Sequence, residues 1–224
     1  MDWEAIRLSL RLASLTMVLL LALGLPLAYW LAFSSRRWTF LVEAVVALPL
    51  VLPPTVLGFY LLLAMGPQSP FGRAWERLFG STLPFSFEGL LIASVLYSLP
   101  FMVQPLAESF GNVDRGLIEA SRCLGESRFR TFFRVIIPLS WGGLLTGLVL
   151  TFAHTLGEFG VVLMVGGNLP GRTRTVSIAI YDQVQAMDYG PATRTAALLL
   201  GLSFLVLVLT YGLRRRQRSP WRLF

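Results

Sequence analysis

Five long apolar runs constrain this chain more than any other feature. They cover residues 8–33, 40–65, 87–107, 135–165 and 192–213. A helix needs about 20 apolar residues to cross a bilayer, so each run is long enough for one span. The chain is 55% hydrophobic and 14% charged, whereas soluble domains carry about 25% charged residues. We therefore predict an all-α polytopic membrane protein, with five transmembrane helices in a single domain over residues 1–224.

The arginines predict the orientation of these helices. All 19 basic residues are arginine, and the net charge is +7. Twelve arginines fall on the cytoplasmic side if the N-terminus is outside, and seven fall on the other side. The positive-inside rule then predicts an outer N-terminus and a cytoplasmic C-terminus. The clusters are interpreted as topology determinants and lipid-headgroup contacts, and we expect no nucleic-acid partner.

Several kinds of chemistry are poorly supported by this sequence. Its single cysteine, Cys123, and single histidine, His154, argue against a disulfide and against a metal centre. No phosphate-binding G-x-x-x-x-G-K-[ST] loop occurs, so we expect no ATPase activity, no catalytic residues and no cofactor in this chain. An intramembrane protease would need a nucleophile beside His154, and the sequence gives no convincing partner for it. A secondary transporter usually shows repeats and coupling carboxylates, and no repeat is detectable here.

Prolines interrupt the second apolar run at Pro49, Pro53 and Pro54. Each removes a backbone donor, which is tolerated where neighbouring helices or a watery cavity satisfy the freed carbonyls. The run is therefore either a bent helix that lines a pathway or a helix with a packing kink. We expect Pro53, Pro54, Thr55 and Thr151 to line a pathway, although hydroxyls in membrane helices also bond their own backbone.

The segment between the third and fourth runs, residues 111–134, is here called the coupling loop. Asp114 is a suitable N-cap, because its carboxylate can accept the free N–H groups that begin a helix. Gly125 can adopt the left-handed conformation that ends one. Ser127 can cap a second helix. The pattern predicts two short helices joined at Gly125.

Aromatic and basic residues follow this predicted turn. They are Phe129, Phe132 and Phe133, with Arg128, Arg130 and Arg134 beside them. A solvated loop has no need of three phenylalanines. This composition is typical of a surface that docks onto another protein.

The same stretch resembles the EAA loop of ABC importer permeases, which reads E-A-A, three residues, G, nine residues, I-x-L-P. Glu119 and Ala120 match its start, Gly125 falls at the required spacing, and Pro138 closes it. Small or apolar residues replace the others: Ser121, Val135 and Ile137. Several positions fall in register, so the signal is strong.

The resemblance extends over almost the whole chain. Residues 48–58 (LPLVLPPTVLG), 156–160 (LGEFG) and 171–182 (GRTRTVSIAIYD) are similar to segments of molybdate permeases. Sulfate and tungstate permeases share parts of these motifs. The chain is thus identified as similar to the molybdate permease family, which has the MetI-like permease fold.

The resemblance implies a permease subunit in the bacterial or archaeal plasma membrane. It implies a homodimer around a central pathway, two copies of an ABC ATPase, and an extracytoplasmic oxyanion-binding protein. The expected cargo is molybdate, with tungstate or sulfate as alternatives. The residues that would couple the chain to the ATPase are Asp114, Glu119, Ala120, Gly125, Arg128, Phe129, Phe132 and Pro138.

Three charged residues outside the coupling loop also draw attention. Arg172 and Arg174 can attract an oxyanion or contact the binding protein through forked hydrogen bonds, and the resemblance favours the binding protein. Glu158 lies inside the fourth run, where we expect a hydrogen bond to a neighbouring helix or arginine, because a carboxylate repels anions. Short helices are expected over residues 73–78 and 175–185.

Overall fold

The computed structural model describes residues 2–217, and all the regular secondary structure in that part of the chain is helical. The all-α prediction is confirmed. Three helices are long and apolar enough to cross a bilayer by themselves. They are α1 (Trp3–Phe33), α5 (Phe87–Gly111) and α12 (Tyr189–Gln217).

Two bent pairs of helices add to these three. The axes of α2 (Thr39–Val51) and α3 (Pro54–Met65) differ by 114°, and α9 (Trp141–Gly157) is bent by 75° from the stretch Arg128–Leu139 before it. Counting each bent pair as one span gives up to five crossings in the described chain.

The fourth apolar run differs most from its expected form. Residues 135–165 were predicted as one span, but the structure divides them at Ser140 and again at Glu158, after which α10 (Gly160–Gly166) begins. Ser140 follows Pro138, which cannot donate a helical hydrogen bond. No proline lies near Glu158 in the sequence, so a missing backbone donor does not explain the second break.

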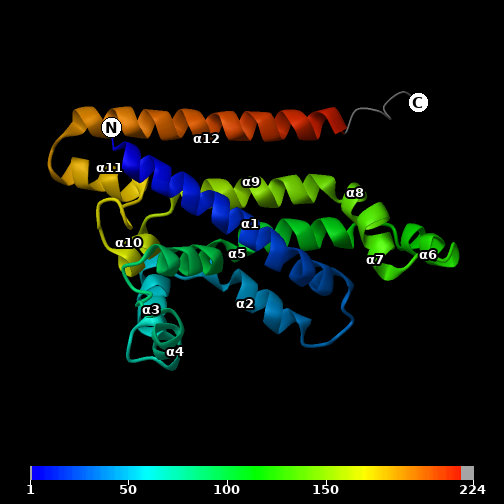
Figure 1. Cartoon of the computed structure of the whole chain (residues 1–224). Helices are drawn as coiled ribbons and strands as arrows, with labels where there is room; N and C mark the ends of the chain where they lie inside the picture. Colours follow the sequence, from blue (N-terminus) through cyan, green and yellow to red (C-terminus); the bar gives the residue numbers. More distant parts are fainter. Residues whose placement is uncertain (1, 218–224) are drawn as a thin grey trace.

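Short helices occupy the two ends of the bundle (Figure 1). One end, called the loop end, holds α6 (Arg115–Cys123), α7 (Arg128–Thr131), the π-helix η1 (Phe132–Ile136) and α8 (Ile137–Leu139). The other, called the arm end, holds α3, α4 (Pro70–Phe79), α10 and α11 (Val176–Gln185). The helices expected at 73–78 and 175–185 are therefore confirmed as α4 and α11, and α1 begins at the arm end.

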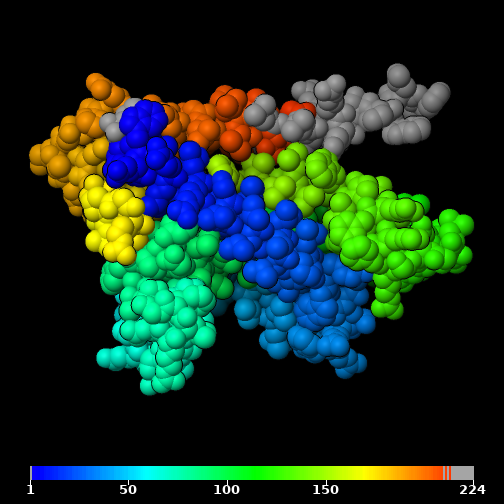
Figure 2. Space-filling model, in the orientation of Figure 1, coloured from blue at the N-terminus to red at the C-terminus, as the bar shows by residue number. Residues whose placement is uncertain are grey.

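Two apolar clusters follow the same division. The loop-end core contains Leu20, Ala28, Val46, Met102, Val103, Leu106, Phe110, Val113, Ile118, Ile136 and Leu144. The arm-end core contains Met65, Leu83, Ala93, Val161 and Val165. Only α5 supplies buried residues to both of these clusters among the described helices. The α3–α4 arm projects beside α2, and a notch separates them in the space-filling view (Figure 2).

Glycines allow the closest helix contacts. A Cβ added to Gly143 on α9 would lie 2.7 Å from the carbonyl oxygen of Pro105 on α5, so the two helices approach backbone to backbone there. A Cβ at Gly160 would lie 2.7 Å from Cβ of Pro54, and one at Gly58 would lie 2.7 Å from Cβ of Met164. These last two contacts fasten α10 to α3. Small residues permit such close packing between membrane helices.

Candidate functional site: the coupling loop and its polar surroundings

The coupling loop has the local structure that its sequence predicts. Asp114 caps α6, because its Oδ1 accepts a hydrogen bond of 2.8 Å from the backbone N–H of Gly116. Gly125 has φ of +84° and turns the chain after α6. Ser127 caps α7 by accepting from the N–H of Arg130 at 3.3 Å. All three local predictions are confirmed.

Side chains hold the two loop helices together. The hydroxyls of Ser121 and Thr131 lie 3.1 Å apart and join α6 to α7. Arg134 donates to Glu126 at 2.8 Å, and Arg130 lies 3.6 Å from the same carboxylate. Both arginines are exposed, so each pair contributes about 0.2–1 kcal/mol. The loop is preorganised mainly by its caps, its turn and its packing.

The solvent side of the coupling loop is apolar to an unusual degree. Its four large exposed side chains are Leu117 at 49%, Leu124 at 85%, Phe129 at 73% and Phe133 at 52%. The predicted residues Glu119, Ala120, Gly125 and Arg128 are also exposed. The rings of Phe129 and Phe133 lie 4.6 Å apart, and exposed apolar patches mark interaction surfaces. The arrangement therefore suits burial against another protein.

Phe132 does not lie on this exposed side. Its ring packs edge-on against Tyr29 of α1 at 5.2 Å between centroids, and against Phe110 of α5 at 5.9 Å. Sequence reasoning grouped it with Phe129 and Phe133, but helical spacing places neighbouring residues on different faces. Phe132 thus belongs to the base of the loop, where it contacts the loop-end core.

Ile118 is a loop residue that sequence reasoning missed. It is buried at 6% exposure and belongs to the loop-end core together with Ile136. Its signal was the spacing within α6, where an apolar residue stands four positions after the Asp114 cap. Ile118 and Phe132 both pack in the loop-end core, so direct contacts connect the coupling loop to α1 and α5.

Pro138 explains the unusual helix that leads into α9. Proline cannot donate to the carbonyl four residues earlier, and its ring would clash with that group. The backbone instead widens into the π-helix η1, where the N–H of Ile137 bonds the carbonyl of Phe132. The bend at Ser140 follows, and Ser140 exchanges hydrogen bonds with Ser109 of α5 at 3.2 and 3.4 Å. Pro138 itself is exposed.

The four pathway candidates are not gathered in one place. Pro53, Pro54 and Thr55 lie together at the break between α2 and α3, and all three are exposed. Thr151 is fully buried within α9, and its hydroxyl has no hydrogen-bond partner among the described residues. The exposed group suits a pathway wall, whereas the burial of Thr151 suits helix packing.

A row of polar side chains, buried except for the half-buried His154, joins α5 to the end of α9. Ser94 donates to Oε2 of Glu158 at 2.9 Å. One turn further along α5, the hydroxyl of Ser98 lies 2.9 Å from Nδ1 of His154 and 3.0 Å from the hydroxyl of Thr155. The expected hydrogen bond from Glu158 to a neighbouring helix is confirmed. Its serine partners carry no signature in the sequence, so sequence reasoning did not pair them.

The two arginines after α10 have different environments. Arg174 is enclosed by acceptors: it lies 3.8 Å from Asp2 and 3.4 Å from Asp182, and its Nε donates to Asn168 at 2.6 Å. It thereby ties the start of α1 to α11, and its charge is met within the chain. Arg172 is exposed.

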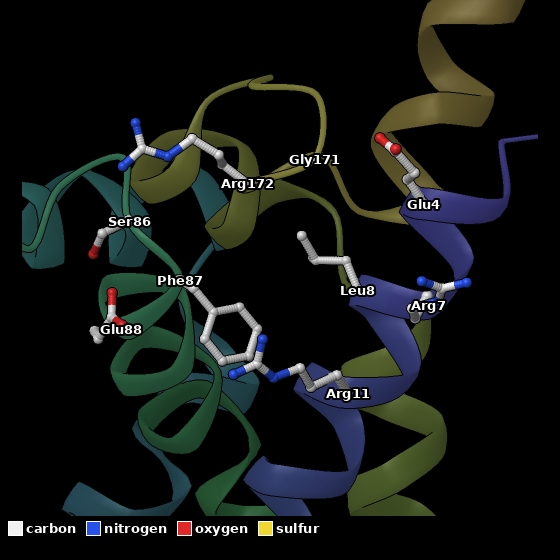
Figure 3. A pocket seen from close by; sticks show the side chains of 9 residues that line it. All are labelled: Glu4, Arg7, Leu8, Arg11, Ser86, Phe87, Glu88, Gly171 and Arg172. Carbon is white, nitrogen blue, oxygen red and sulfur yellow. The ribbon is translucent and has the colours of Figure 1, made fainter.

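Arg172 lines a groove of about 480 Å³ at the arm end, between the starts of α1 and α5 (Figure 3). On its α1 wall, the guanidinium of Arg11 lies 4.5 Å from the ring centroid of Phe87. Arg7 and Arg172 lie on opposite sides of the groove, so the three guanidinium groups do not converge on one point. Glu4 and Glu88 are also in the lining. The groove suits a protein edge better than a small ion.

The fold and the coupling loop define a helical membrane protein with exposed apolar side chains at one end. Residues 24–219 match the family described as binding-protein-dependent transport system inner membrane component. The chain belongs to this family. That places it among the membrane-embedded components of binding-protein-dependent transport systems, which agrees with its membrane-length helices.

Relatives and solved structures agree with this assignment. The chain is 53% identical to the molybdenum transport system permease protein ModB of Azotobacter vinelandii, over 96% of this chain and 95% of that protein. It is 36% identical to the protein of the same name from Escherichia coli K12, over 97% and 96%. A bacterial alginate ABC transporter in complex with its periplasmic protein has a similar fold, with a TM-score of 0.76 at 15% identity, over 96% of this chain and 79% of that one.

Proposed function

We propose that this chain is the permease subunit of an ATP-driven importer of molybdate. The observation that carries the proposal is the 53% identity, over nearly the full length of both chains, to a permease named for molybdenum transport. The coupling loop supports it independently, since its exposed apolar side chains suit an ATPase partner. Tungstate and sulfate are the alternative cargoes, because parts of the sequence motifs are shared with their permeases.

The proposed assembly contains two copies of this chain, two ATPase subunits and a binding protein on the outer face. In this arrangement the coupling loop faces the cytoplasm and the start of α1 faces outward. The two features lie at opposite ends of the bundle, as this orientation requires (Figure 1). The groove lined by Arg11 and Arg172 then faces the binding protein.

The coupling loop supplies the mechanical step of the proposal. Closure of the ATPases on ATP moves α6, whose buried Ile118 packs in the loop-end core. The core residues Leu20, Met102 and Leu144 move with it and carry α1, α5 and α9. Two copies that rock in this way expose the pathway alternately to the two sides of the membrane.

Transport by purified components in vesicles tests the proposal. The permease is reconstituted with its ATPase, and uptake of molybdate is measured with and without the binding protein and ATP. We expect uptake only when all components are present, and competition by tungstate stronger than by sulfate. Uptake that persists without ATP or without the ATPase would contradict the proposal, and preferred uptake of sulfate would change the cargo.

A further inference from the structure

The breaks in two different membrane segments meet in one place. The chain is interrupted between α2 and α3 at Leu52–Pro53, and between α9 and α10 at Glu158–Phe159. Gly160 contacts Pro54 just beyond the two breaks, and Gly58 contacts Met164 one turn further on. The two short helices therefore form one packed body, here called the α3–α10 unit. This unit contributes most of the arm-end core.

The two serines that bond the end of α9 lie on α5, between the parts of α5 that enter the two cores. Ala93, beside Ser94, belongs to the arm-end core, and Met102 begins the contribution of α5 to the loop-end core. Ser94 and Ser98 occupy the interval between them. Glu158, which Ser94 holds, is itself the residue at the α9–α10 break. α5 already packs on the α3–α10 unit through Ala93 and through Leu90, which clusters with Val162 of α10. The Ser94–Glu158 hydrogen bond adds a polar contact between α5 and the break at which the unit begins.

Burial of the Glu158 carboxyl group costs desolvation free energy. It is 4% exposed, and while Oε2 accepts from Ser94, Oε1 is buried without a hydrogen-bond partner in the described part of the chain. An apolar side chain would fill the space without this desolvation cost. A buried polar group that is only half satisfied in one conformation suits an element with two arrangements, in which its contacts are exchanged.

We propose that the Ser94–Glu158 hydrogen bond is a latch that fixes the α9–α10 break against α5, beside the apolar packing of α5 on α10, and is released and remade in each transport cycle. Glu158 acts as a positioning residue: it sets where the unit sits relative to the loop-end core and does not bind the cargo. The inference rests on the proposed transport function and adds the residues at which movement of the loop-end core is passed to the arm end.

The test measures the number of anions transported per ATP hydrolysed by the complete reconstituted complex. Ser94→Ala and Glu158→Ala each remove the latch, and both should lower this ratio roughly three- to tenfold, the range expected for the loss of one hydrogen bond. Glu158→Gln keeps an acceptor for Ser94 and should stay within about twofold of the unchanged chain. The double alanine variant should be no worse than either single variant, because both remove one interaction.

Thr16→Val is the matched control. Thr16 is fully buried on α1, and its hydroxyl has no partner among residues 2–217, so the change removes a buried hydroxyl without touching the latch. Its transport ratio should be unchanged. Co-purification of the ATPase shows that each variant assembles. Ser94→Ala removes only one oxygen atom and keeps the test decisive if Glu158→Ala does not assemble.

Three results would overturn the latch. They are a normal transport ratio in Ser94→Ala, a loss in Glu158→Gln as large as in Glu158→Ala, or additive losses in the double variant. Each of these three results presupposes that the complex without substitutions imports the anion. If the unchanged complex shows no ATP-dependent uptake, the proposed function fails instead, so the two failures are distinguishable.

Discussion

The α2–α3 break and the α9–α10 break lie against each other, yet they differ in chemistry. At the first, Pro53 and Pro54 lack backbone N–H groups, and the chain turns by 114° at an exposed site. At the second there is no proline; Glu158 is buried, and Ser94 of a different helix holds its side chain. The first break follows from the covalent structure of its own prolines. The second is stabilised by the helices that pack around it.

The comparison shows how a membrane helix can be interrupted without a proline. Glycines flank the second break, at Gly157 and Gly160, and lower the cost of leaving the helix. The contact of Gly160 with Pro54 then stabilises the broken helix, because α10 packs on α3 only when its axis diverges from that of α9. Each break thus contributes to the stability of the other.

Replacement of Gly160 should have the largest effect on stability. In Gly160→Ala the new Cβ would lie 2.7 Å from Cβ of Pro54, which belongs to a rigid ring. We expect a loss of about 1–3 kcal/mol, as for overpacked cores, together with reduced transport. Thermal unfolding of the purified permease in detergent measures it.

Gly157→Ala provides the control for this prediction. A Cβ there meets no other described atom within 4 Å, and Gly157 ends α9 in helical conformation. Alanine should leave the unfolding temperature unchanged or raise it slightly, since it is the better helix former. Equal destabilisation by the two alanines would show that α3 and α10 do not depend on close contact.

Gly125→Val should have the next largest effect, at the turn of the coupling loop. A β-branched residue at φ of +84° costs about 1–2 kcal/mol, because its side chain is strained in the left-handed region. We expect the loop to shift and the ATPase to bind more weakly, as measured by the amount that co-purifies with the permease. Gly125→Asn should retain more binding, since asparagine tolerates this conformation. Normal binding and transport by the valine variant would refute the role of the turn.

Restoring the backbone N–H groups that Pro53 and Pro54 lack, at the α2–α3 break, should have the smallest effect. In the double variant Pro53→Ala and Pro54→Ala, the freer unfolded chain should lower stability by about 0.4–1 kcal/mol per proline. The break itself should remain, because Gly58 still packs on Met164. Unfolding temperature and transport are the readouts. A large loss of transport at nearly normal stability would show that proline rigidity itself is needed for function.

The coupling loop was the part of the molecule most completely predicted from sequence. Asp114, Gly125 and Ser127 act through their own backbone neighbours, so their roles follow from local rules. Phe132 was assigned to the exposed surface because it lies beside Phe129 and Phe133 in sequence, whereas contacts with Tyr29 and Phe110 turn it inward. The roles proposed for the exposed loop residues remain predictions that binding to the ATPase will test.

The polar contacts were the least predictable. Ser94 and Glu158 are 64 positions apart, and lone serines are common in membrane helices. The ion pairs of Arg174 with Asp2 and Asp182 likewise depend on how α1 and α11 meet. Sequence reasoning gave Arg172 and Arg174 the same role, but the structure leaves only Arg172 exposed.

The amino-acid sequence by itself determined that this is a helical membrane protein. It also determined the proline break and the caps of the coupling loop. These follow from composition and from interactions between residues a few positions apart, which are close together whatever the rest of the fold. Only the tertiary structure showed the inward turn of Phe132 and the pairing of Ser94 with Glu158, and it completed the break at Glu158 that the flanking glycines permit. The physical reason is that those features depend on contacts between helices, and only the packed bundle brings the partners together.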